Sequence, residues 1–377
     1  MKNKSFLEIC CLAAITFTSH GVNAAGESDP IRLGVSLPLT SPLAVSAKQF
    51  LDGAQACFGD VNLKGGIRGR KIELLVLDDK FDPVKVVENS RELLQKQVVS
   101  LFGYMGTPGV LQMGKFTSEY KIPLVGAVSG SPAAKDPNNK YLFVMRASFQ
   151  QEAAMAVNIG VSTGTTSWGV VYQEDASGKA ALDGVVSMLQ KNGLKPAMAA
   201  SFVGAKPDFT ATIKQVAEIK PSALFFGGNA PALAGLVRAA KEKGVVLPSI
   251  TSLSLANLSE VTNMLGDAAV GLKFTQPIPY PFNTRTQTSA EYARVMKAHS
   301  REQPSFPGME GYLAAKLMVT VLDKTPSVTP ERIVATLESM KFVPVTPEFL
   351  VTYGPGDCTG SKFVDMLMIG TNRAVIR

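Results

Sequence analysis

Short apolar runs alternate with longer amphipathic stretches along most of the chain. Residues 31–37 and 71–77 are short, mainly apolar stretches, which suit parallel strands that are covered on both faces. The stretch between them predicts a helix over residues 46–63, because its apolar positions recur at the spacing of one helical face. These positions are Phe50, Ala54, Cys57 and Val61. Three glycines, Gly65, Gly66 and Gly69, then allow the chain to reverse into the second strand.

The same alternation continues toward the C-terminus. Further strands are expected at 98–103, 122–128, 168–172, 197–203, 223–226 and 247–251. Further helices are expected at 83–96, 107–120, 149–160, 178–191, 208–219, 231–242, 286–302, 308–323 and 330–340. Asp82-Pro83, Thr107-Pro108 and Thr329-Pro330 are interpreted as a capping residue followed by proline at a helix start. Alternating strands and helices predict parallel sheets with helices on both faces.

Two such series predict an α/β protein with two doubly wound parallel-sheet lobes, joined by a hinge that the chain crosses several times. We expect residues 26–144 plus 276–344 to form lobe one, and 145–275 plus 345–377 to form lobe two. The extended stretches 141–148 and 272–279 are the first two crossings, and a third is expected near 342–350. In open α/β sheets, ligands bind beyond the carboxyl ends of the strands, so the two lobes should face each other across a ligand-binding cleft.

The last part of the chain predicts antiparallel strands. Residues 350–353 and 362–369 are apolar, and glycines at 354 and 360 bound the segment between them. We expect this segment to be the turn that joins the two strands.

Residues 1–24 have the pattern of a secretory signal peptide. Lys2 and Lys4 precede the apolar run Ile9–Phe17, and Val22-Asn23-Ala24 is a small-residue cleavage site. The apolar run is shorter than the roughly 20 residues that span a bilayer. A buried N-terminal helix is the alternative. We expect a cleaved signal peptide and an exported, periplasmic protein.

Composition and charge favour an ordinary soluble protein. The chain is 46% hydrophobic and 18% charged, and its net charge of +7 comes from scattered basic residues. A solvated surface therefore explains the charge better than nucleic-acid binding does. Two cysteines follow the signal peptide, Cys57 and Cys358. A disulfide between them and burial of Cys57 as a small apolar residue both remain open.

Catalytic motifs are weak. His299 is the one histidine beyond the predicted signal peptide, and we expect it on the surface of a polar helix. Residues 160–164 match G-x-S-x-G but run from a helix end to a strand start, which is the wrong order for a nucleophile elbow. Residues 109–115 match G-x-x-x-x-G-K inside a predicted helix, where they could not cradle phosphate. Histidine and cysteine residues do not cluster at the spacings typical of a metal site. We therefore expect no enzyme, no cofactor and no metal.

Several segments together resemble one known family. They are LGVSLPLTSPLA (33–44), the block 53–79, DPVKVVENSRELL (82–94), LFGYMGTPG (101–109), FVMRAS (143–148), VVYQEDASGKAALDGV (170–185), DFTATIKQV (208–216), FFGGNAP (225–231), SFPGMEGYLAAKLMV (305–319) and YGPGDCTGSKFVDMLMIG (353–370). In order and spacing they resemble the periplasmic solute-binding proteins of ABC importers of the leucine, isoleucine and valine type. The resemblance implies the type I periplasmic binding fold.

The resemblance also implies a carboxylate site in lobe one. The matching positions are Thr107, Ala127 and Ser129, with Ser46 lining the first loop. Thr107 begins a predicted helix, where free N–H groups and the helix dipole favour an anion. Two alternatives remain open: Thr107 could cap its own helix, and Ser131-Pro132 could be the cap near Ser129.

Other positions depart from the family pattern. Where amino-acid binders hold the ligand ammonium with acidic groups, this chain has Gln151 and Leu253, and where they have aromatic residues it has Ser177 and Asn229. A buried ammonium without a carboxylate costs several kcal/mol, as an order of magnitude. The departures favour a carboxylate-bearing or neutral solute over an ordinary α-amino acid.

We therefore expect an exported, monomeric substrate-binding component that delivers a small-molecule ligand to an ABC permease in the inner membrane, without contact to nucleic acid. A sensor that reports to a separate membrane receptor and a true branched-chain amino-acid binder are the alternatives on the same scaffold. A secreted hydrolase is the third class, and the lack of a suitably placed histidine argues against it.

Overall fold

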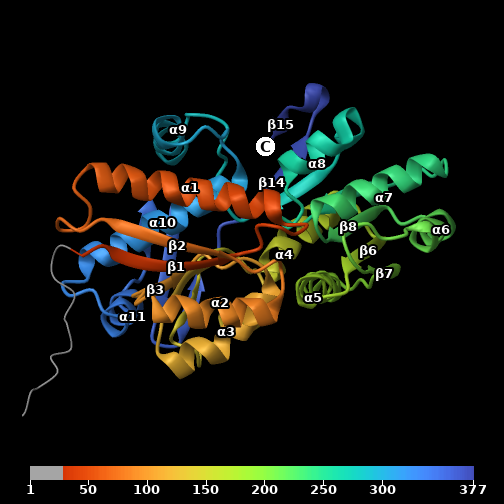
Figure 1. Ribbon diagram of the computed structural model, residues 1–377. Coiled ribbons are helices and arrows are strands. Elements are labelled where there is room, and N and C mark those ends of the chain that lie inside the picture. Colours follow the sequence, from red (N-terminus) through yellow and green to blue (C-terminus); the bar gives the residue numbers. More distant parts are fainter. Residues whose placement is uncertain (1–28) are drawn as a thin grey trace, which may run out of the picture.

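The chain folds into two α/β bodies that lie side by side, as Figure 1 shows. The computed structural model describes residues 29–377, so the signal peptide predicted at 1–24 lies outside the described residues. Each body is built on one large sheet with helices on both faces. The predicted fold class, two doubly wound lobes with parallel strands, is confirmed.

The first sheet has five parallel strands in the order β2-β1-β3-β4-β5. The strands are β1 (Ile31–Leu37), β2 (Ile72–Asp78), β3 (Ser100–Phe102), β4 (Leu124–Ala127) and β5 (Leu142–Val144). Adjacent residues of the inner strands point to opposite faces, as the two-residue repeat of a strand requires. Leu101 and Leu124 belong to the apolar core on one face, while Phe102 and Val125 belong to the core on the other.

Six helices accompany this sheet. They are α1 (Ala44–Leu63), α2 (Pro83–Gln95), α3 (Thr107–Tyr120), α9 (Gln287–His299), α10 (Phe306–Lys324) and α11 (Pro330–Glu338). Apolar residues of α2 and α3 fill the core on one face, and those of α1 and α10 fill the core on the other. Helices α1 and α10 are in backbone contact, because a Cβ atom on Gly53 would lie 1.9 Å from the carbonyl oxygen of Gly308.

The second sheet has seven strands in the order β15-β14-β10-β9-β8-β6-β7. Parallel strands make up most of it: β6 (Trp168–Gln173), β7 (Met198–Phe202), β8 (Ala223–Gly227), β9 (Ser249–Ser252) and β10 (Lys273–Gln276). At one edge β14 (Asp365–Ile369) runs antiparallel to β10, and β15 (Val375–Ile376) runs antiparallel to β14. The stretch predicted as the second crossing therefore begins as a strand, β10.

Helices cover both faces of the second sheet as well. They are α4 (Phe149–Ser162), α5 (Ala176–Lys191), α6 (Thr210–Ile219), α7 (Ala230–Glu242) and α8 (Leu258–Leu265). The sequence pattern did not predict α8. Its N-terminus is capped by Asn257, whose side chain accepts hydrogen bonds from the N–H groups of Ser259 and Glu260.

The predicted pairing near the C-terminus is wrong. Strand β12 (Phe349–Gly354) pairs with β13 (Asp357–Gly360) and with β11 (Val343–Thr346) in a separate three-stranded sheet, whereas β14 joins the second large sheet. The turn is shorter than expected, because residues 357–360 are themselves a strand.

The small sheet packs against lobe one, next to β5, α10 and α11. A Cβ atom on Gly360 would lie 2.2 Å from the Val144 carbonyl oxygen, and the Ser361 N–H donates to the Met145 carbonyl oxygen at 2.7 Å. The lobe bounds stay a prediction. This packing favours a third crossing at 361–364, beside the first, over one at 342–350.

A buried ionic cluster joins the crossings. Arg146, in the first crossing, lies 3.4 Å from the Glu152 carboxylate on α4 and 3.5 Å from the Glu310 carboxylate on α10. Its guanidinium also donates to the Ser254 hydroxyl, while Thr275 of β10 donates to Glu152 at 2.7 Å. Burial raises the pKa of Glu310, and the nearby positive charge of Arg146 opposes that rise. The cluster thus connects both lobes through charged side chains that are at most 7% exposed.

The two described cysteines are free and buried. Cys57 packs in the core beneath α1, where burial raises the pKa of its thiol to about 12. Its side chain therefore acts as a small apolar residue. Within residues 29–377, no helix combines the length and apolarity needed to cross a membrane.

Candidate functional site

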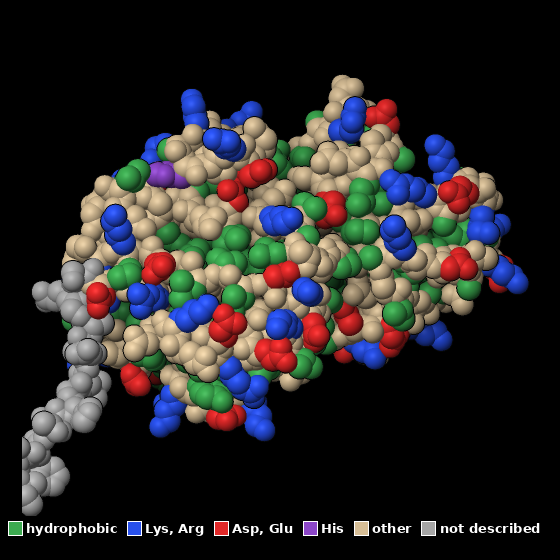
Figure 2. All heavy atoms as spheres, in the orientation of Figure 1, with side chains coloured by type: hydrophobic (Ala, Val, Ile, Leu, Met, Phe, Trp, Pro, Cys, Tyr) green, Lys and Arg blue, Asp and Glu red, His purple; other side chains and the backbone are tan. Residues whose placement is uncertain are grey.

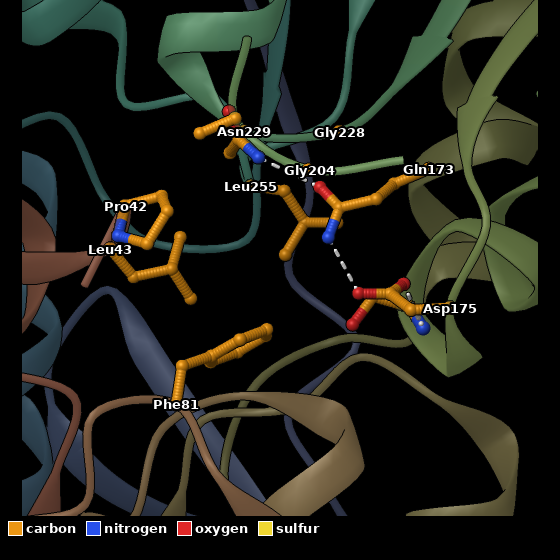
Figure 3. A pocket seen from close by; sticks show the side chains of 11 residues that line it. Pro42, Leu43, Phe81, Gln173, Asp175, Gly204, Gly228, Asn229 and Leu255 are labelled. Carbon is orange, nitrogen blue, oxygen red and sulfur yellow. Dashed lines mark hydrogen bonds between the residues drawn. The ribbon is translucent and has the colours of Figure 1, made fainter. Parts of the chain in front are cut away.

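A pocket of about 170 Å³ lies between the two bodies. Every residue that lines it ends a strand, lies in the loop after a strand, or caps or opens the helix that comes next. Lobe one contributes Pro42, Leu43 and Phe81, and the second body contributes Gln173, Asp175, Ser177, Gly204, Ala205, Gly228, Asn229 and Leu255. Figure 3 shows the two groups facing each other. The pocket therefore lies where open α/β sheets bind ligands.

Phe81 forms the lobe-one wall because two carboxylates hold its turn. Lys80 and Phe81 both have positive φ, 56° and 66°, which is uncommon for residues other than glycine. The Lys80 N–H donates to Asp78 and the Phe81 N–H donates to Asp79, each at 2.9 Å. The ring of Phe81 lies against Gly106, where a Cβ atom would come within 2.6 Å of it. Any side chain at position 106 would displace this ring.

Asp79 supports the turn from a buried position. It is 1% exposed, and its second oxygen accepts a hydrogen bond from the Ser36 hydroxyl at 2.9 Å. Burial raises the pKa of Asp79 to about 6, although its hydrogen bonds from Phe81 and Ser36 oppose the change. The support of the Phe81 wall is thus a carboxyl group that titrates near pH 6.

The opposite wall is a chain of hydrogen-bonded polar side chains. Asn229 caps α7, accepting from the Ala232 N–H at 3.0 Å, and donates through its amide to Gln173 at 2.8 Å. Gln173 donates in turn to the Asp175 carboxylate at 2.7 Å. Asp175 also caps α5, since one of its oxygens accepts from the N–H groups of Ser177 and Gly178, both at 2.9 Å.

The predicted carboxylate site lies at the start of α3. Gly106 is the N-cap of this helix and has a φ of 102°, so the prediction that Thr107 caps its own helix is wrong. The Thr107 hydroxyl instead lies 2.9 Å from the Ser129 hydroxyl, and both side chains are at most 2% exposed. Neither residue lines the pocket, but Gly106 touches the Phe81 ring that does. The pair is therefore next to the pocket and covered.

Backbone N–H groups near the start of α3 remain available to bind a ligand. Within residues 29–377, the N–H groups of Thr107, Gly109 and Ser129 have no hydrogen-bond acceptor. Ser131 does not cap the short 3₁₀ helix Pro132–Lys135 through its side chain, and its own N–H donates to the Ser129 hydroxyl at 3.2 Å. Free amides at a helix start and two hydroxyls are the donors that a carboxylate needs.

The other predicted positions lie in different surroundings. Ser177 and Asn229 line the pocket, as noted above. Ala127 is buried at the end of β4, and Leu253 is fully buried in a core beneath α4 and α5. Gln151 is used locally, because its side chain accepts from the Ser148 N–H at 2.7 Å in a capping box.

Ser46 is part of a direct contact between the two bodies. The Asn257 amide, at the start of α8, donates to the Ser46 hydroxyl at 3.2 Å and to the Gln49 side chain at 2.8 Å on α1. Asn257 is only 4% exposed. These bonds join α1 of lobe one to the start of α8 in the second body.

Sequence reasoning missed Asp175, Gln173, Phe81 and Leu255 as pocket residues. A signal was present for two of them: Asp175 precedes a glycine-containing helix start, which is an N-cap pattern, and Phe81 lies in the loop directly after a strand. Side-chain direction in a loop depends on backbone angles that the residue pattern does not give. The strand ends therefore predicted the place of the pocket but not its lining.

The weak catalytic motifs have structural explanations. Ser162 lies in the last turn of α4 and donates to the Ile159 carbonyl oxygen, and residues 109–115 lie inside α3. His299 ends α9, with its Nε2 atom 3.4 Å from an oxygen of Asp60, and does not line the pocket. Three or more potential metal ligands do not come together anywhere in residues 29–377. On the face seen in Figure 2, basic and acidic side chains are interspersed.

Comparisons with known proteins agree with this geometry. The family model described as "Periplasmic binding protein" matches residues 30–361. A Leu/Ile/Val-binding protein of Rhizobium johnstonii is 25% identical over 336 residues, which is 88% of this chain and 90% of that protein. The resemblance seen in the sequence segments is thereby confirmed.

Solved structures show the same fold. A substrate-binding periplasmic protein from Ralstonia solanacearum superimposes with a TM-score of 0.85 at 28% identity, covering 92% of this chain and 99% of that one. A fatty acid ABC transporter substrate-binding protein from Thermomonospora curvata gives a TM-score of 0.84 at 20% identity, with 93% and 92% coverage. The match of the family model over most of the chain, together with two lobes that enclose a pocket at their strand ends, shows that the chain belongs to the family of periplasmic binding proteins.

Proposed function

We propose that this protein is the exported substrate-binding component of an ABC importer. It captures a small carboxylate-bearing solute between its lobes in the periplasm and delivers it to a permease in the inner membrane. It acts as a monomer and changes no covalent bond of the solute. A ligand that contacts both lobes favours the closed arrangement by its higher affinity for that state.

One observation carries the proposal: within residues 29–377, backbone N–H groups without acceptors converge with two hydroxyls beside the pocket between the lobes. The free N–H groups of Thr107 and Gly109 lie in the first turn of α3, which follows β3, and that of Ser129 lies in the loop after the neighbouring strand β4. The hydroxyls of Thr107 and Ser129 lie 2.9 Å apart. The positive end of the α3 dipole adds to their preference for an anion. A carboxylate bound there would reach the pocket past Phe81, whose ring touches Gly106.

The α-ammonium of an amino acid lacks its usual partners at the two expected positions. Gln151 is bound in a capping box and carries no charge, and Leu253 is fully buried in an apolar core. We therefore propose that an ordinary α-amino acid is not the preferred ligand. A second candidate, a branched-chain amino-acid binder, is favoured by the names of relatives such as the Leu/Ile/Val-binding protein of Rhizobium johnstonii.

Calorimetric titration of the exported chain tests the proposal. Ligands found by a thermal-shift screen of short-chain acids, aromatic acids and amino acids are titrated, and a carboxylic acid should bind while leucine, isoleucine and valine do not. Thr107→Val should weaken the binding of the carboxylate by roughly 10-fold or more, because a hydrogen bond to a charged group is lost.

Thr117→Val is the matched control, since Thr117 is a buried threonine of the same helix whose hydroxyl bonds to the Met113 carbonyl oxygen, outside the site. It should leave the affinity unchanged. Micromolar or tighter binding of any of the three branched-chain amino acids would favour the second candidate instead.

A further inference from the structure

Asp175 is the one charged side chain among the residues that line the pocket between the lobes. We propose that it sets the substrate class: a monocarboxylate with a short apolar body whose far end carries a hydrogen-bond donor, either a hydroxyl or an ammonium group. This inference rests on the proposed function, because the carboxylate end of the ligand is assigned to the donors beside Thr107.

The direction of every hydrogen bond along the polar wall is fixed by backbone groups. The Asn229 side-chain oxygen accepts from the Ala232 N–H, so its NH₂ group must face Gln173. The Gln173 oxygen accepts that bond, so its own NH₂ group must face Asp175. Asp175 receives a second and a third donor from the N–H groups of Ser177 and Gly178. Neither amide can be reversed without placing donor against donor.

This arrangement requires Asp175 to be an acceptor at both oxygens. One oxygen accepts the two backbone N–H groups at the start of α5, and the other accepts only the Gln173 amide. A carboxylate offers about four lone-pair positions, so the oxygen next to Gln173 can accept one more hydrogen bond. The residue is partly exposed and lines the pocket, so a ligand can supply that donor.

The facing wall cannot satisfy Asp175 from lobe one. Pro42, Leu43 and Phe81 are the lobe-one residues of the pocket, and none of them has a side-chain donor. Figure 3 shows Leu43 and Phe81 directed into the pocket opposite Asp175 and Gln173. These apolar side chains suit the middle of a ligand whose donor group reaches across to the polar wall.

The same charge excludes a second carboxylate at the far end of the ligand. Two like charges in a partly buried pocket repel each other, and no basic side chain lines the pocket to compensate them. Dicarboxylates should therefore bind more weakly than monocarboxylates of equal length.

Two pairs of ligands and one substitution test the assignment. Titration calorimetry compares 4-hydroxyphenylacetate with phenylacetate, and 5-aminovalerate with valerate, so that the hydroxyl and the ammonium are each measured against a parent that lacks a donor. We expect the donor to raise the affinity at least about tenfold in one of the pairs. In Asp175→Asn the asparagine oxygen should still cap α5, which turns its NH₂ group toward Gln173 and the pocket, so no acceptor remains there and the preference should disappear. The affinity for the parent compound, which makes no bond to residue 175, should stay within about twofold.

Asp208→Asn is the matched control. Asp208 is exposed, accepts from the Thr210 N–H at 2.8 Å just before α6, and does not line the pocket, so the substitution removes one negative charge elsewhere in the second body. Its ligand preference should equal that of the unmodified protein. Thermal unfolding of both variants checks that the fold is retained.

Three results would overturn the inference. The first is binding of the parent acids with no gain from either donor. The second is a gain that survives in Asp175→Asn. The third is tight binding of leucine that Asp175→Asn abolishes, since Asp175 would then hold an α-ammonium. Failure of all four acids to bind would contradict the proposed function itself, and the inference would fall with it.

Discussion

Replacing Arg146 by methionine should destabilise the protein strongly, because it leaves two carboxylates buried without their counter-charge. Arg146 is 4% exposed and lies within 3.5 Å of both Glu152 and Glu310, which are 0% and 7% exposed. Removal of one partner from a buried ion pair costs about 3–5 kcal/mol. For roughly 350 residues, the entropy of unfolding is about 0.7 kcal/mol per degree, so the melting temperature should fall by about 4–7 °C.

The loss of stability caused by Arg146→Met should depend on pH. In the variant, nothing opposes the effect of burial on the Glu310 carboxyl, so its pKa rises further above the ordinary value. A group whose pKa is raised by folding stabilises the folded state at low pH, and this contribution disappears as the pH rises through the folded-state pKa. The deficit of Arg146→Met relative to the unmodified protein should therefore be smaller at pH 5 than at pH 7.5.

Differential scanning calorimetry at the two pH values measures both effects. Arg32→Met is the matched control, because Arg32 pairs with Glu73 at 3.2 Å while their side chains are 39% and 46% exposed. An exposed pair contributes at most about 1 kcal/mol. Adding Glu310→Gln to Arg146→Met should recover part of the lost stability. A loss below 1 kcal/mol for Arg146→Met, or a deficit that grows on acidification, would refute the reasoning.

Two further predictions concern the contact between the lobes and the Phe81 wall. Asn257→Ser keeps a capping residue on α8 but removes the bonds to Ser46 and Gln49. The affinity for the ligand should fall roughly 10-fold. Small-angle X-ray scattering of the ligand-free variant should show a larger radius of gyration than that of the unmodified protein. An unchanged radius and affinity would contradict this. Asp79→Asn removes a carboxyl group whose pKa is raised from 3.8 to about 6. As the pH rises from about 4 to 7, the unmodified protein should therefore lose about 3 kcal/mol of its free energy of unfolding, and the variant should not show this loss. Urea unfolding across that pH range measures the free energy of unfolding of both proteins. If it changes with pH equally in the two, the raised pKa of Asp79 is contradicted.

Much of the fold follows from the spacing of apolar residues. The strand predicted at 31–37 has the bounds of β1, and Phe50, Ala54 and Cys57 are buried on the predicted face of α1. These elements are long or fully buried. Burial of one helix face requires apolar residues to recur at the spacing of that face, and this spacing is visible in the sequence. Helix α8 was missed because it is short, although Asn257 and Glu260 at its start are typical of a capped helix.

The C-terminal strands were paired wrongly for a different reason. Adjacent apolar runs around glycines predict a hairpin, but pairing between strands depends on contacts that are remote in sequence. Here β14 finds its partner in β10, some ninety residues earlier, and β12 finds β11 and β13. Local pattern alone does not distinguish these arrangements.

The sequence predicts where in the fold the pocket lies but not which side chains line it. Parallel strands predicted that the loops after their carboxyl ends would meet, and the pocket lies there. Thr107-Pro108 predicts a cap at Thr107, whereas Gly106 takes that position and leaves the Thr107 hydroxyl to pair with Ser129. Proline is tolerated at more than one position of a first turn, so this pair of residues does not fix the helix start.

The central claim is that the lobes close on the carboxylate of a small solute beside the start of α3. A crystal structure of the complex with the tightest-binding acid from the screen tests it most directly. We expect a carboxylate oxygen within about 3.2 Å of the Thr107 hydroxyl or of the N–H groups at the start of α3, with the rest of the solute between Phe81 and Asp175. A solute held elsewhere, or one whose carboxylate lies away from Thr107 and Ser129, would contradict the account.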